Sequence, residues 1–366
     1  MKRCRTCIMV DTRPRIVFDE TGQCNACSWA EAKRTIDWQE RRTEFQELLD
    51  KIDRSGPYDC IVPFSGGKDS ACIAWRLKFE FGLRPLLVTY GQLLWTDCGR
   101  HNYDQLCRLG FDCLYWRTDQ EVSRRLARRF MLERGHPKLH YDSAVNAVPL
   151  ITAVKFNIPL IVYAEHGESE YGGLVLSEGH RKVRPLDEVL ENQVGDDARN
   201  WVEPGISERD LYPYILPEPA EIARVGATAV YFSYFFRWAS PLNAAFIASK
   251  IDWRCAEGGR SEGTFTGHDS IDDKIDGIDY WMMYRKYGFG RALRDANRHI
   301  QNGLMTREQG IEVVRRYDDE FPERYFGECL EYMKMTRDEF YAAADAHTNP
   351  NIFTRTPNGW RHEYPL

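Results

Sequence analysis

The sequence predicts an α/β fold built on a parallel sheet, and three observations support this class. Short apolar runs typical of buried strands alternate with longer segments of helical periodicity. The first of these runs passes through a glycine-rich turn straight into a helical segment, an arrangement suited to phosphate binding. A chain of 366 residues with 43% hydrophobic composition is long enough for a full core with a second domain or a large insertion.

The central part of the chain supplies the expected strands and helices in alternation. The apolar runs predicted as strands are residues 58–64, 84–90, 111–118, 158–165 and 227–236. The segments predicted as helices are residues 68–81, 99–109, 120–134, 143–156 and 241–253. Helices that link parallel strands form right-handed crossovers, so helices are expected on both faces of the sheet.

Two regions are expected before the sheet begins. Residues 1–30 form a short, turn-rich and cysteine-bearing module. Residues 31–56 form a helical connector. Their charges and spaced apolar residues belong to a single exposed helical pattern that starts at Trp29.

Two further regions are expected from residue 57 onward. Residues 57–255 form the α/β domain, interrupted at about 167–219 by an insertion or substrate loop rich in Gly, Pro, Glu and Asp. Residues 256–366 form a loop followed by a helical domain. Its expected helices are residues 280–300, 306–321 with a cap at Thr306, and 336–347 with a cap at Thr336.

Composition and charge argue against several classes of partner and location. The net charge of −6 gives no overall basic field for a nucleic-acid backbone, so nucleic acid is not expected as a partner. No signal-like apolar stretch and no run approaching 18 apolar residues is present, so a membrane is not expected either. Most of the 11 cysteines are scattered, which favours a reducing compartment and a cytoplasmic location.

The first four cysteines form two CxxC pairs separated by sixteen residues. Cys4, Cys7, Cys24 and Cys27 have the spacing of a zinc ribbon, in which each pair supplies two thiolates from one tight turn. Four protein ligands leave no open position, so the zinc should be structural. Four thiolates also suit an iron–sulfur cluster, but the ribbon spacing and the lack of other redox motifs favour zinc.

The glycine-rich turn is the stretch Ser65-Gly66-Gly67-Lys68-Asp69-Ser70, between an apolar run and a helical segment. Two glycines before a helix present unpaired N–H groups and the positive end of the helix dipole to an anion. The Walker pattern requires a glycine six residues before the lysine and a hydroxyl residue after it. Val62 and Asp69 occupy these places, so the turn is not a Walker loop.

This stretch resembles the SGGxDS loop of the PP-loop (N-type) ATP pyrophosphatases, which include GMP synthetase, NAD synthetase, argininosuccinate synthetase and the tRNA sulfurtransferases. The resemblance implies an adenine nucleotide α-hydrolase-like fold, cleavage of ATP between its α and β phosphates, and Mg²⁺ to offset the charge. It also implies that the loop grips the departing pyrophosphate, with Lys68 and Asp69 as catalytic residues. The loop residues implied to bind ATP are Ser65, Gly66, Gly67, Lys68, Asp69 and Ser70.

A second carboxylate is expected to join Asp69 at Mg²⁺. Glu165 ends the apolar run 158–165, and ligands of open α/β sheets gather outside the carboxyl ends of strands. Glu168 and Glu170 are alternatives. By analogy with the fold, the backbone around Thr89, at the end of the second expected strand, should meet the adenine.

Four stretches together resemble the N-acetyl sugar amidotransferases of bacterial surface polysaccharide, including lipopolysaccharide O-antigen, and nonulosonic acid biosynthesis. These stretches are the cysteine pairs, the SGGKDS loop, AEHGE, and a later segment GTFTGHDSIDDKIDG. The resemblance covers nearly the whole chain, although SGGKDS alone is shared across the superfamily.

This resemblance implies that ATP adenylates the acetamido oxygen of a nucleotide-linked N-acetyl sugar. Ammonia then displaces AMP, and an acetamidino group remains. An amide oxygen is a poor leaving group, and its conversion to a phosphoester makes the displacement feasible. Because the chain has no recognisable glutaminase constellation, the ammonia would come from a separate glutaminase subunit.

The segment from Gly263 to Gly277 is dense in Asp and Gly and has two interpretations. It is either a polar loop that caps the next helix or the part that meets the acceptor sugar or ATP. In the second case Asp272, Asp273 and Lys274 are candidates, with Lys274 as a catalytic phosphate contact. Weaker candidates are Arg260, His268, Arg291 and a possible base, His166, although a structural histidine is the commoner outcome.

Two other functions remain open from the sequence. A PP-loop tRNA sulfurtransferase shares the loop and often has paired cysteines, but the seven cysteines after the first four show no further CxxC pair. A non-catalytic zinc-ribbon scaffold is the other alternative, and the intact Lys68 and Asp69 argue against it. The aromatic stretch 231–236 is expected in the core and not at a sugar platform.

Overall fold

The computed structural model describes residues 1–185 and 195–366 and confirms an α/β fold. Five parallel strands form one sheet in the order β3-β2-β1-β4-β5. Ile61 in the central strand β1 lies in register with Leu86 of β2 on one side and Ile161 of β4 on the other. The strands are β1 Cys60–Pro63, β2 Pro85–Tyr90, β3 Asp112–Trp116, β4 Leu160–Tyr163 and β5 Thr228–Tyr231.

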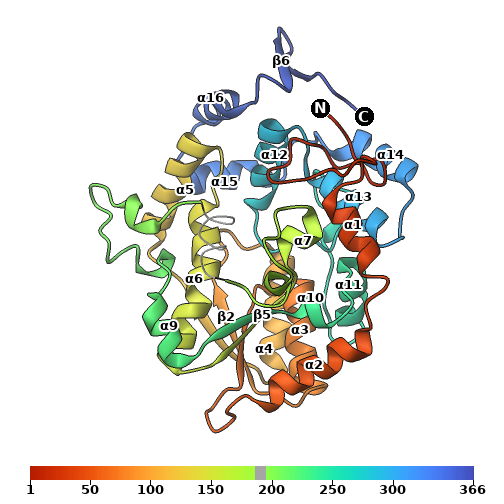
Figure 1. Cartoon of the computed structure of the whole chain (residues 1–366). Coiled ribbons are helices and arrows are strands. Elements are labelled where there is room, and N and C mark those ends of the chain that lie inside the picture. The colour runs from red at the N-terminus through yellow and green to blue at the C-terminus, as the bar shows by residue number, and fades with distance from the viewer. Residues whose placement is uncertain (186–194) are drawn as a thin grey trace.

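Helices cover both faces of the sheet, as the sequence predicts (Figure 1). Ile61 and its neighbour Val62 belong to two different hydrophobic cores, because successive side chains of a strand point to opposite faces. One core includes α5 Gln120–Arg134, α6 Leu139–Phe156 and several C-terminal helices. The other includes α2 Trp38–Asp50, α3 Lys68–Phe79, α4 Asp97–Arg108 and α11 Ser240–Ala248.

Three expected elements differ from the structure. The helix expected at 280–300 is interrupted at residues 288–290, where Gly288 adopts φ +74°, and forms two helices, α12 Asp276–Tyr287 and α13 Arg291–Gln301. The helical pattern after Trp29 is two helices, α1 Asn25–Ala32 and α2, because the Asp37 side chain caps α2 by accepting bonds from two backbone amides. The expected strand 227–236 ends at Tyr231, where the chain turns into the short helix α10 Phe232–Phe235. The aromatic residues of this stretch are nevertheless buried in the core, as expected.

The C-terminal region is helical and ends in a hairpin. The expected caps are confirmed, because Thr306 and Thr336 each form a capping box. The sequence prediction did not include α15, which starts without a capping side chain, or the hairpin of β6 and β7. The elements are α12 Asp276–Tyr287, α13 Arg291–Gln301, α14 Arg307–Tyr317, α15 Phe326–Met333, α16 Arg337–His347, β6 Phe353–Thr356 and β7 Gly359–His362.

The expected insertion is largely irregular where the structure describes it. It begins with α7 Gly167–Tyr171, and α9 Pro219–Val225 follows it. Val183 forms an antiparallel bridge with Val230 of β5, so the insertion returns to the edge of the sheet. Its central part, residues 186–194, lies outside the described residues. The described residues of the insertion also include three short 3₁₀ helices, at Glu178–Arg181, Ala198–Trp201 and Tyr212–Tyr214.

The N-terminal module does not stand apart from the rest of the chain. Ile8 and Met9 are buried in a third hydrophobic core together with Phe289 and Leu293 at the start of α13. In Figure 1 the first residues lie beside α13 and α14, near the C-terminus. Among the described residues, no helix is both long enough and apolar enough to cross a membrane.

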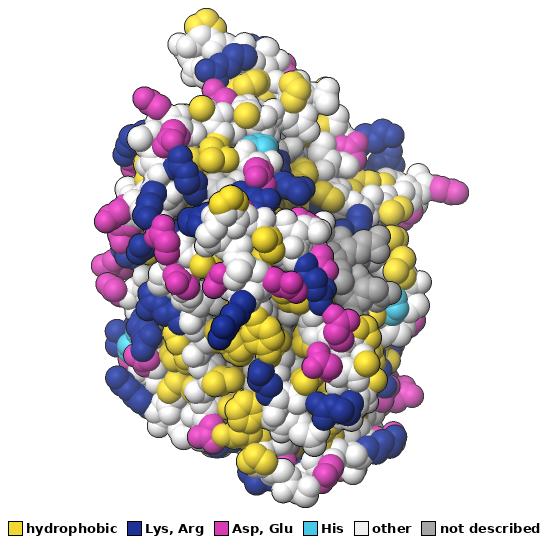
Figure 2. All heavy atoms as spheres, turned by 90° about the vertical axis from the view of Figure 1, so that its left-hand side faces the viewer, with side chains coloured by type: hydrophobic (Ala, Val, Ile, Leu, Met, Phe, Trp, Pro, Cys, Tyr) yellow, Lys and Arg dark blue, Asp and Glu magenta, His cyan; other side chains and the backbone are white. Residues whose placement is uncertain are grey.

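A shallow groove lies between α6 and α9, at the end of the molecule away from the C-terminal hairpin. Its volume is about 700 Å³, and Ile151, Tyr212 and Leu216 are among its lining residues. Figure 2 shows hydrophobic side chains gathered in the lower part of this side of the molecule, with basic and acidic side chains interspersed around them.

Candidate functional site

The glycine-rich loop and Glu165 lie at the point where the strand order reverses. β2 follows β1 in the sequence and lies on one side of it, while β4 lies on its other side. The connections that leave the neighbouring strands β1 and β4 therefore run in opposite directions along the sheet. The loop follows the carboxyl end of β1, and Glu165 follows the carboxyl end of β4. In open α/β sheets this crevice is where ligands bind.

The glycine-rich loop at residues 65–70, which we call the phosphate loop after its predicted role, is fitted closely to its neighbours. Gly66 has φ +88°, and a Cβ there would lie 2.8 Å from the backbone nitrogen of Tyr103 on α4, so only glycine fits. The Trp253 indole donates a hydrogen bond to the Gly66 carbonyl at 3.0 Å. Gly67 is the N-cap of α3 and has no capping side chain, which leaves the start of α3 suited to an anion.

Lys68 lies buried between two carboxylates. Its ammonium donates to Asp69 at 2.8 Å and also to Asp269, which the sequence prediction did not single out. Burial alone would lower the pKa of Lys68, but Asp269 and Asp69 outweigh it and raise that pKa above its usual range. Lys68 is therefore a fixed positive charge at the N-terminus of α3.

Asp69 and Glu165 lie close enough to influence one another's charge. Burial raises the pKa of Glu165, and the negative charge of Asp69 raises it further. Asn243 donates to Asp69 at 2.8 Å, and the Tyr171 hydroxyl donates to Glu165 at 3.0 Å. Two carboxylates that repel each other at a strand end form a donor set that suits Mg²⁺, which prefers oxygen ligands.

The alternative metal ligands Glu168 and Glu170 are engaged elsewhere. Arg15 binds both carboxylate oxygens of Glu168, at 2.8 and 3.1 Å. Glu170 is buried and accepts from three donors, namely Trp29 at 2.9 Å, Lys33 at 2.8 Å and Arg298 at 2.6 Å. Both carboxylates therefore hold the N-terminal module and α13 against α7.

The four cysteines of the N-terminal module come together as predicted. Their sulfur atoms are buried and lie within 4.8 Å of one another. The Sγ atoms of Cys4 and Cys27 are 3.9 Å apart, and those of Cys7 and Cys24 are 3.7 Å apart. A tetrahedral zinc with Zn–S bonds of about 2.3 Å needs sulfurs roughly 3.8 Å apart, so the residues fit this metal.

Backbone amides support the thiolates of this cluster. The amide of Met9 donates to the Cys7 sulfur at 3.4 Å, and the amide of Cys24 donates to the Cys4 sulfur at 3.2 Å. Such bonds stabilise the negative charge of metal-bound thiolates. With four protein ligands the metal would be structural.

Residues 262–364 match the family LPS biosynthesis protein WbpG-like, C-terminal domain. No curated protein matches the chain. The match supports a role in polysaccharide biosynthesis and indicates an enzyme. The matched WbpG-like segment contains Asp269 and all five helices from α12 to α16.

Asp269 connects the WbpG-like segment to the phosphate loop. Besides Lys68 it accepts a hydrogen bond from Ser240 of α11 at 3.1 Å, while Asn243 on the same helix holds Asp69. Burial favours the neutral acid, but Lys68 and other nearby cations hold the pKa of Asp269 far below its usual range. The only sequence signal for Asp269 was its position within the Asp-rich stretch 263–277.

The predicted candidates Asp272, Asp273 and Lys274 have three different environments. Asp272 lies near the Ser65 side chain of the phosphate loop and accepts a hydrogen bond from Gln92 at 2.6 Å. Asp273 is buried and accepts hydrogen bonds from the backbone amides of residues 93 and 94, at 3.1 and 3.2 Å. It therefore fixes the position of the chain after β2. The Lys274 ammonium binds Glu328 of α15 at 2.6 Å, away from Lys68 and its two carboxylates.

The weaker candidates are mainly held in structural contacts. Arg260 forms two bonds of 2.7 Å with Glu320, and Arg291 donates to the backbone carbonyl of Asp269. His268 lies 3.5 Å from the carboxylate of Asp269. The roles of these residues stay predictions.

His166 and Thr89 are both buried. His166 bonds the Ser169 hydroxyl at 2.7 Å, which agrees with a structural histidine. Thr89 is 1% exposed, and the contact of its backbone with adenine stays a prediction.

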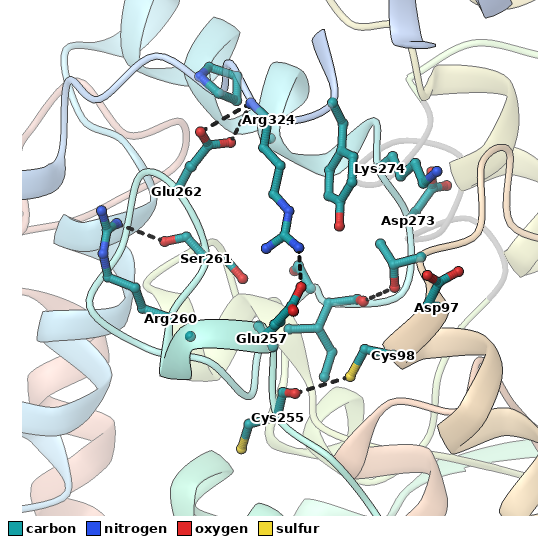
Figure 3. A pocket seen from close by; sticks show the side chains of 18 of the residues that line it. Asp97, Cys98, Cys255, Glu257, Arg260, Ser261, Glu262, Asp273, Lys274 and Arg324 are labelled. Atoms are coloured by element: carbon teal, nitrogen blue, oxygen red, sulfur yellow. Dashed lines mark hydrogen bonds and ion pairs between the residues drawn. The ribbon is translucent and has the colours of Figure 1, made fainter. Parts of the chain in front are cut away.

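Two cavities lie in this part of the molecule, and the smaller one is lined by Ser65 of the phosphate loop. The smaller one, about 130 Å³, lies between the ends of β1 and β2 and α6, and its lining residues are Pro63, Phe64, Ser65, Val88, Tyr90, Tyr141, Val145 and Pro149. The larger one, about 670 Å³, is shown in Figure 3. Arg324 reaches across it toward Glu257, while Lys274 and Asp97 lie at its side.

The larger cavity is close to the ion pair of the phosphate loop. Ser270, which follows Asp269, lines it, and so does Arg291, which donates to the Asp269 carbonyl. Its walls come from the start of α4, from residues 254–261 and from the WbpG-like segment, and they carry both basic and acidic side chains. Ser270 and Arg291 are the lining residues that connect this cavity to Asp269, the partner of Lys68.

Proposed function

We propose that this protein is an ATP-dependent amidotransferase of polysaccharide biosynthesis, with a PP-loop ATP pyrophosphatase domain. Its acceptor would be the acetamido group of a nucleotide-linked N-acetyl sugar. The observation that carries this proposal is the buried pairing of Lys68 in the SGGKDS loop with Asp269 in the WbpG-like segment. This pairing puts a phosphate-binding element and a polysaccharide biosynthesis segment in one site.

The residues at the strand ends account for ATP binding in this proposal. The N-terminus of α3 and residues 65–70 would hold the β and γ phosphates, with Lys68 neutralising part of their charge. Asp69 and Glu165 would hold Mg²⁺, which supplies further neutralisation of the phosphates. The small apolar cavity between β1, β2 and α6 would take the adenine, with the backbone at Thr89 nearby.

The proposed reaction has two steps. The acetamido oxygen attacks the α phosphorus of ATP, the bond to the β phosphate breaks, and pyrophosphate leaves. Ammonia then adds to the activated carbon, AMP departs with the former amide oxygen, and loss of a proton leaves the acetamidino group. The protein contributes positioning, charge neutralisation and exclusion of water, because the activated carbon would otherwise be hydrolysed.

The larger cavity is where we place the acceptor. Its volume of about 670 Å³ and its basic residues, which include Arg254, Arg260, Lys274 and Arg324, suit a large anionic ligand such as a nucleotide sugar. Lys274 would bind the acceptor there and exchange its contact with Glu328 for one with the ligand. Ammonia would come from a glutaminase subunit, and the zinc would stabilise the N-terminal module.

A product assay tests this function directly. The protein would be incubated with ATP, Mg²⁺, ammonium and a panel of UDP-N-acetyl sugars, and the products would be analysed by mass spectrometry. We expect AMP, pyrophosphate and a sugar nucleotide about one mass unit lighter than its acceptor, since NH replaces O. AMP formation that needs neither ammonia nor a sugar would contradict the proposal.

A variant of Asp69 tests whether the phosphate loop is required for the reaction. Asp69→Ala should abolish release of AMP and pyrophosphate while circular dichroism and bound zinc stay unchanged. Retained turnover in this variant would exclude the proposed ATP chemistry, whatever the acceptor.

A further inference from the structure

Two cysteines outside the N-terminal cluster lie in direct contact. Cys107, in the last turn of α4, and Cys113, the second residue of β3, have their sulfur atoms 2.8 Å apart. This distance is shorter than the 3.7 and 3.9 Å between the sulfurs of the metal cluster. A disulfide bond is about 2.05 Å long, so a small approach would suffice to form one.

We propose that Cys107 and Cys113 are a reversible thiol oxidation site that forms an intrachain disulfide and fixes the end of α4 to β3. Both side chains are partly exposed, so a small oxidant reaches them. The proposal does not depend on the amidotransferase function.

The chemistry is thiol–disulfide exchange with a low-molecular-weight disulfide such as oxidised glutathione. The Cys107 thiolate attacks one sulfur of that disulfide and releases one glutathione, which leaves a mixed disulfide. The Cys113 thiolate then attacks the Cys107 sulfur and releases the second glutathione. Two protein thiols are oxidised and one disulfide is reduced to two thiols, since the two protons lost by the protein thiols are taken up by the two released glutathione thiolates.

Cys107 is the better attacking thiol of the pair. The contact with Cys113 lowers the pKa of Cys107 to about 7, and the same contact raises the pKa of Cys113. A thiol whose pKa is close to ambient pH reacts fastest in exchange. The other scattered cysteines differ, because Cys60 and Cys72 are buried with raised pKa values, and Cys98 donates to two backbone carbonyls.

The position of the pair gives its oxidation a route to the phosphate loop. Tyr103 lies one turn before Cys107 on α4, and its backbone is the surface against which Gly66 is packed. The turn between the two cysteines is exposed and passes through Gly110 with φ +76°. A disulfide would fix this end of α4 to the sheet and so restrict the helix that supports the loop.

Peptide mapping of the metal-loaded protein tests the proposal. After incubation of the reduced protein with oxidised glutathione, we expect a mass loss of about 2 Da, a Cys107–Cys113 crosslink, and reversal by dithiothreitol. Amide hydrogen exchange in residues 104–109 should become slower on oxidation. A glutathione adduct at the exposed Cys255 without the crosslink, or unchanged exchange at 104–109 in crosslinked protein, would overturn the proposal.

Serine variants make the test specific. Cys107→Ser and Cys113→Ser should each lose the crosslink, and Cys113→Ser should keep a glutathione adduct on Cys107. Cys255→Ser is the matched control, since it removes an exposed cysteine that lies outside the pair, and it should crosslink as the natural protein does. A crosslink that persists in Cys107→Ser would show that another pair forms it.

Discussion

Lys68 and Asp269 are separated by 201 positions in the sequence and form one buried ion pair at the N-terminus of α3. Lys68 belongs to the phosphate loop, and Asp269 belongs to the WbpG-like segment. A charge removed from one member leaves the other buried with less compensation. The pair therefore links the predicted phosphate loop to the position of the C-terminal region.

Removal of the negative charge of Asp269 should impair the proposed reaction. In Asp269→Asn the ammonium of Lys68 would keep Asp69 as its only carboxylate partner, and we expect the rate of AMP formation to fall by roughly 10²-fold. Glu121→Gln is the control, because Glu121 is 53% exposed and pairs with Lys334 at the surface. A steady-state rate equal to that of the natural protein would exclude a role for the buried pair.

Glu165 should determine how tightly Mg²⁺ is held. Glu165→Gln removes one of the two carboxylates, so the Mg²⁺ concentration that gives half-maximal AMP formation should rise about tenfold. Titration of the rate with MgCl₂ measures this change. Glu178→Gln, at a side chain that is 64% exposed, should behave as the natural protein. If both variants have the same Mg²⁺ dependence, Glu165 is not a ligand.

The contacts of Glu170 predict a loss of stability in acid. Burial alone would raise the pKa of Glu170, but Arg298 and Lys33 lower it from 4.5 to about 2. A lowered pKa stabilises the folded state above the unfolded value, and this contribution is lost as the pH falls from 4.5 toward 2. The shift corresponds to about 3 kcal/mol of unfolding free energy at pH 7.

Urea unfolding of Glu170→Gln at several pH values checks this contribution. The variant should be less stable than the natural protein at pH 7, and the difference should shrink as the pH falls below 4.5. A difference that is independent of pH would mean that shape, and not charge, accounts for the role of Glu170.

Removal of zinc should loosen the N-terminal module and the helices that contact it. A strong chelator, or the variant Cys24→Ser, should expose the remaining cluster thiols to a thiol reagent and lower the midpoint of thermal unfolding. The hydrophobic contacts of Ile8 and Met9 with α13 should open at the same time. Bound iron and sulfide in the purified protein would show that the cluster is not a zinc site.

Gly66 should tolerate no side chain. Gly66→Ala would place a Cβ 2.8 Å from the Tyr103 backbone at φ +88°, so the loop or α4 must move, and AMP formation should be lost. Gly82→Ala is a matched control with a similar backbone, φ +65°, but with open space around its Cβ. It should cost only about 1 kcal/mol of stability and leave the rate unchanged. Equal losses in both variants would contradict a role for the close contact with α4.

Several local features could be predicted because their causes are local. The parallel strands follow from short apolar runs, the caps at Thr306 and Thr336 follow from the residues three positions later, and the cysteine cluster follows from its spacing. The prediction was wrong where tertiary contacts decide the boundary. The strand ending at Tyr231 turns into a helix whose phenylalanines pack in the core, and apolar periodicity cannot distinguish these two outcomes.

The sequence by itself determined the fold class, the glycine-rich loop before α3 and the cluster of four cysteines, since each depends on residues close together in the chain. Only the tertiary structure identified Asp269, Asn243 and Ser240 as the groups around Lys68 and Asp69, and showed that Glu168 and Glu170 hold the N-terminal module. Local sequence cannot give these pairings. A buried charge takes whichever opposite charge the packing of distant helices brings to it, and that choice is made only when the chain is folded.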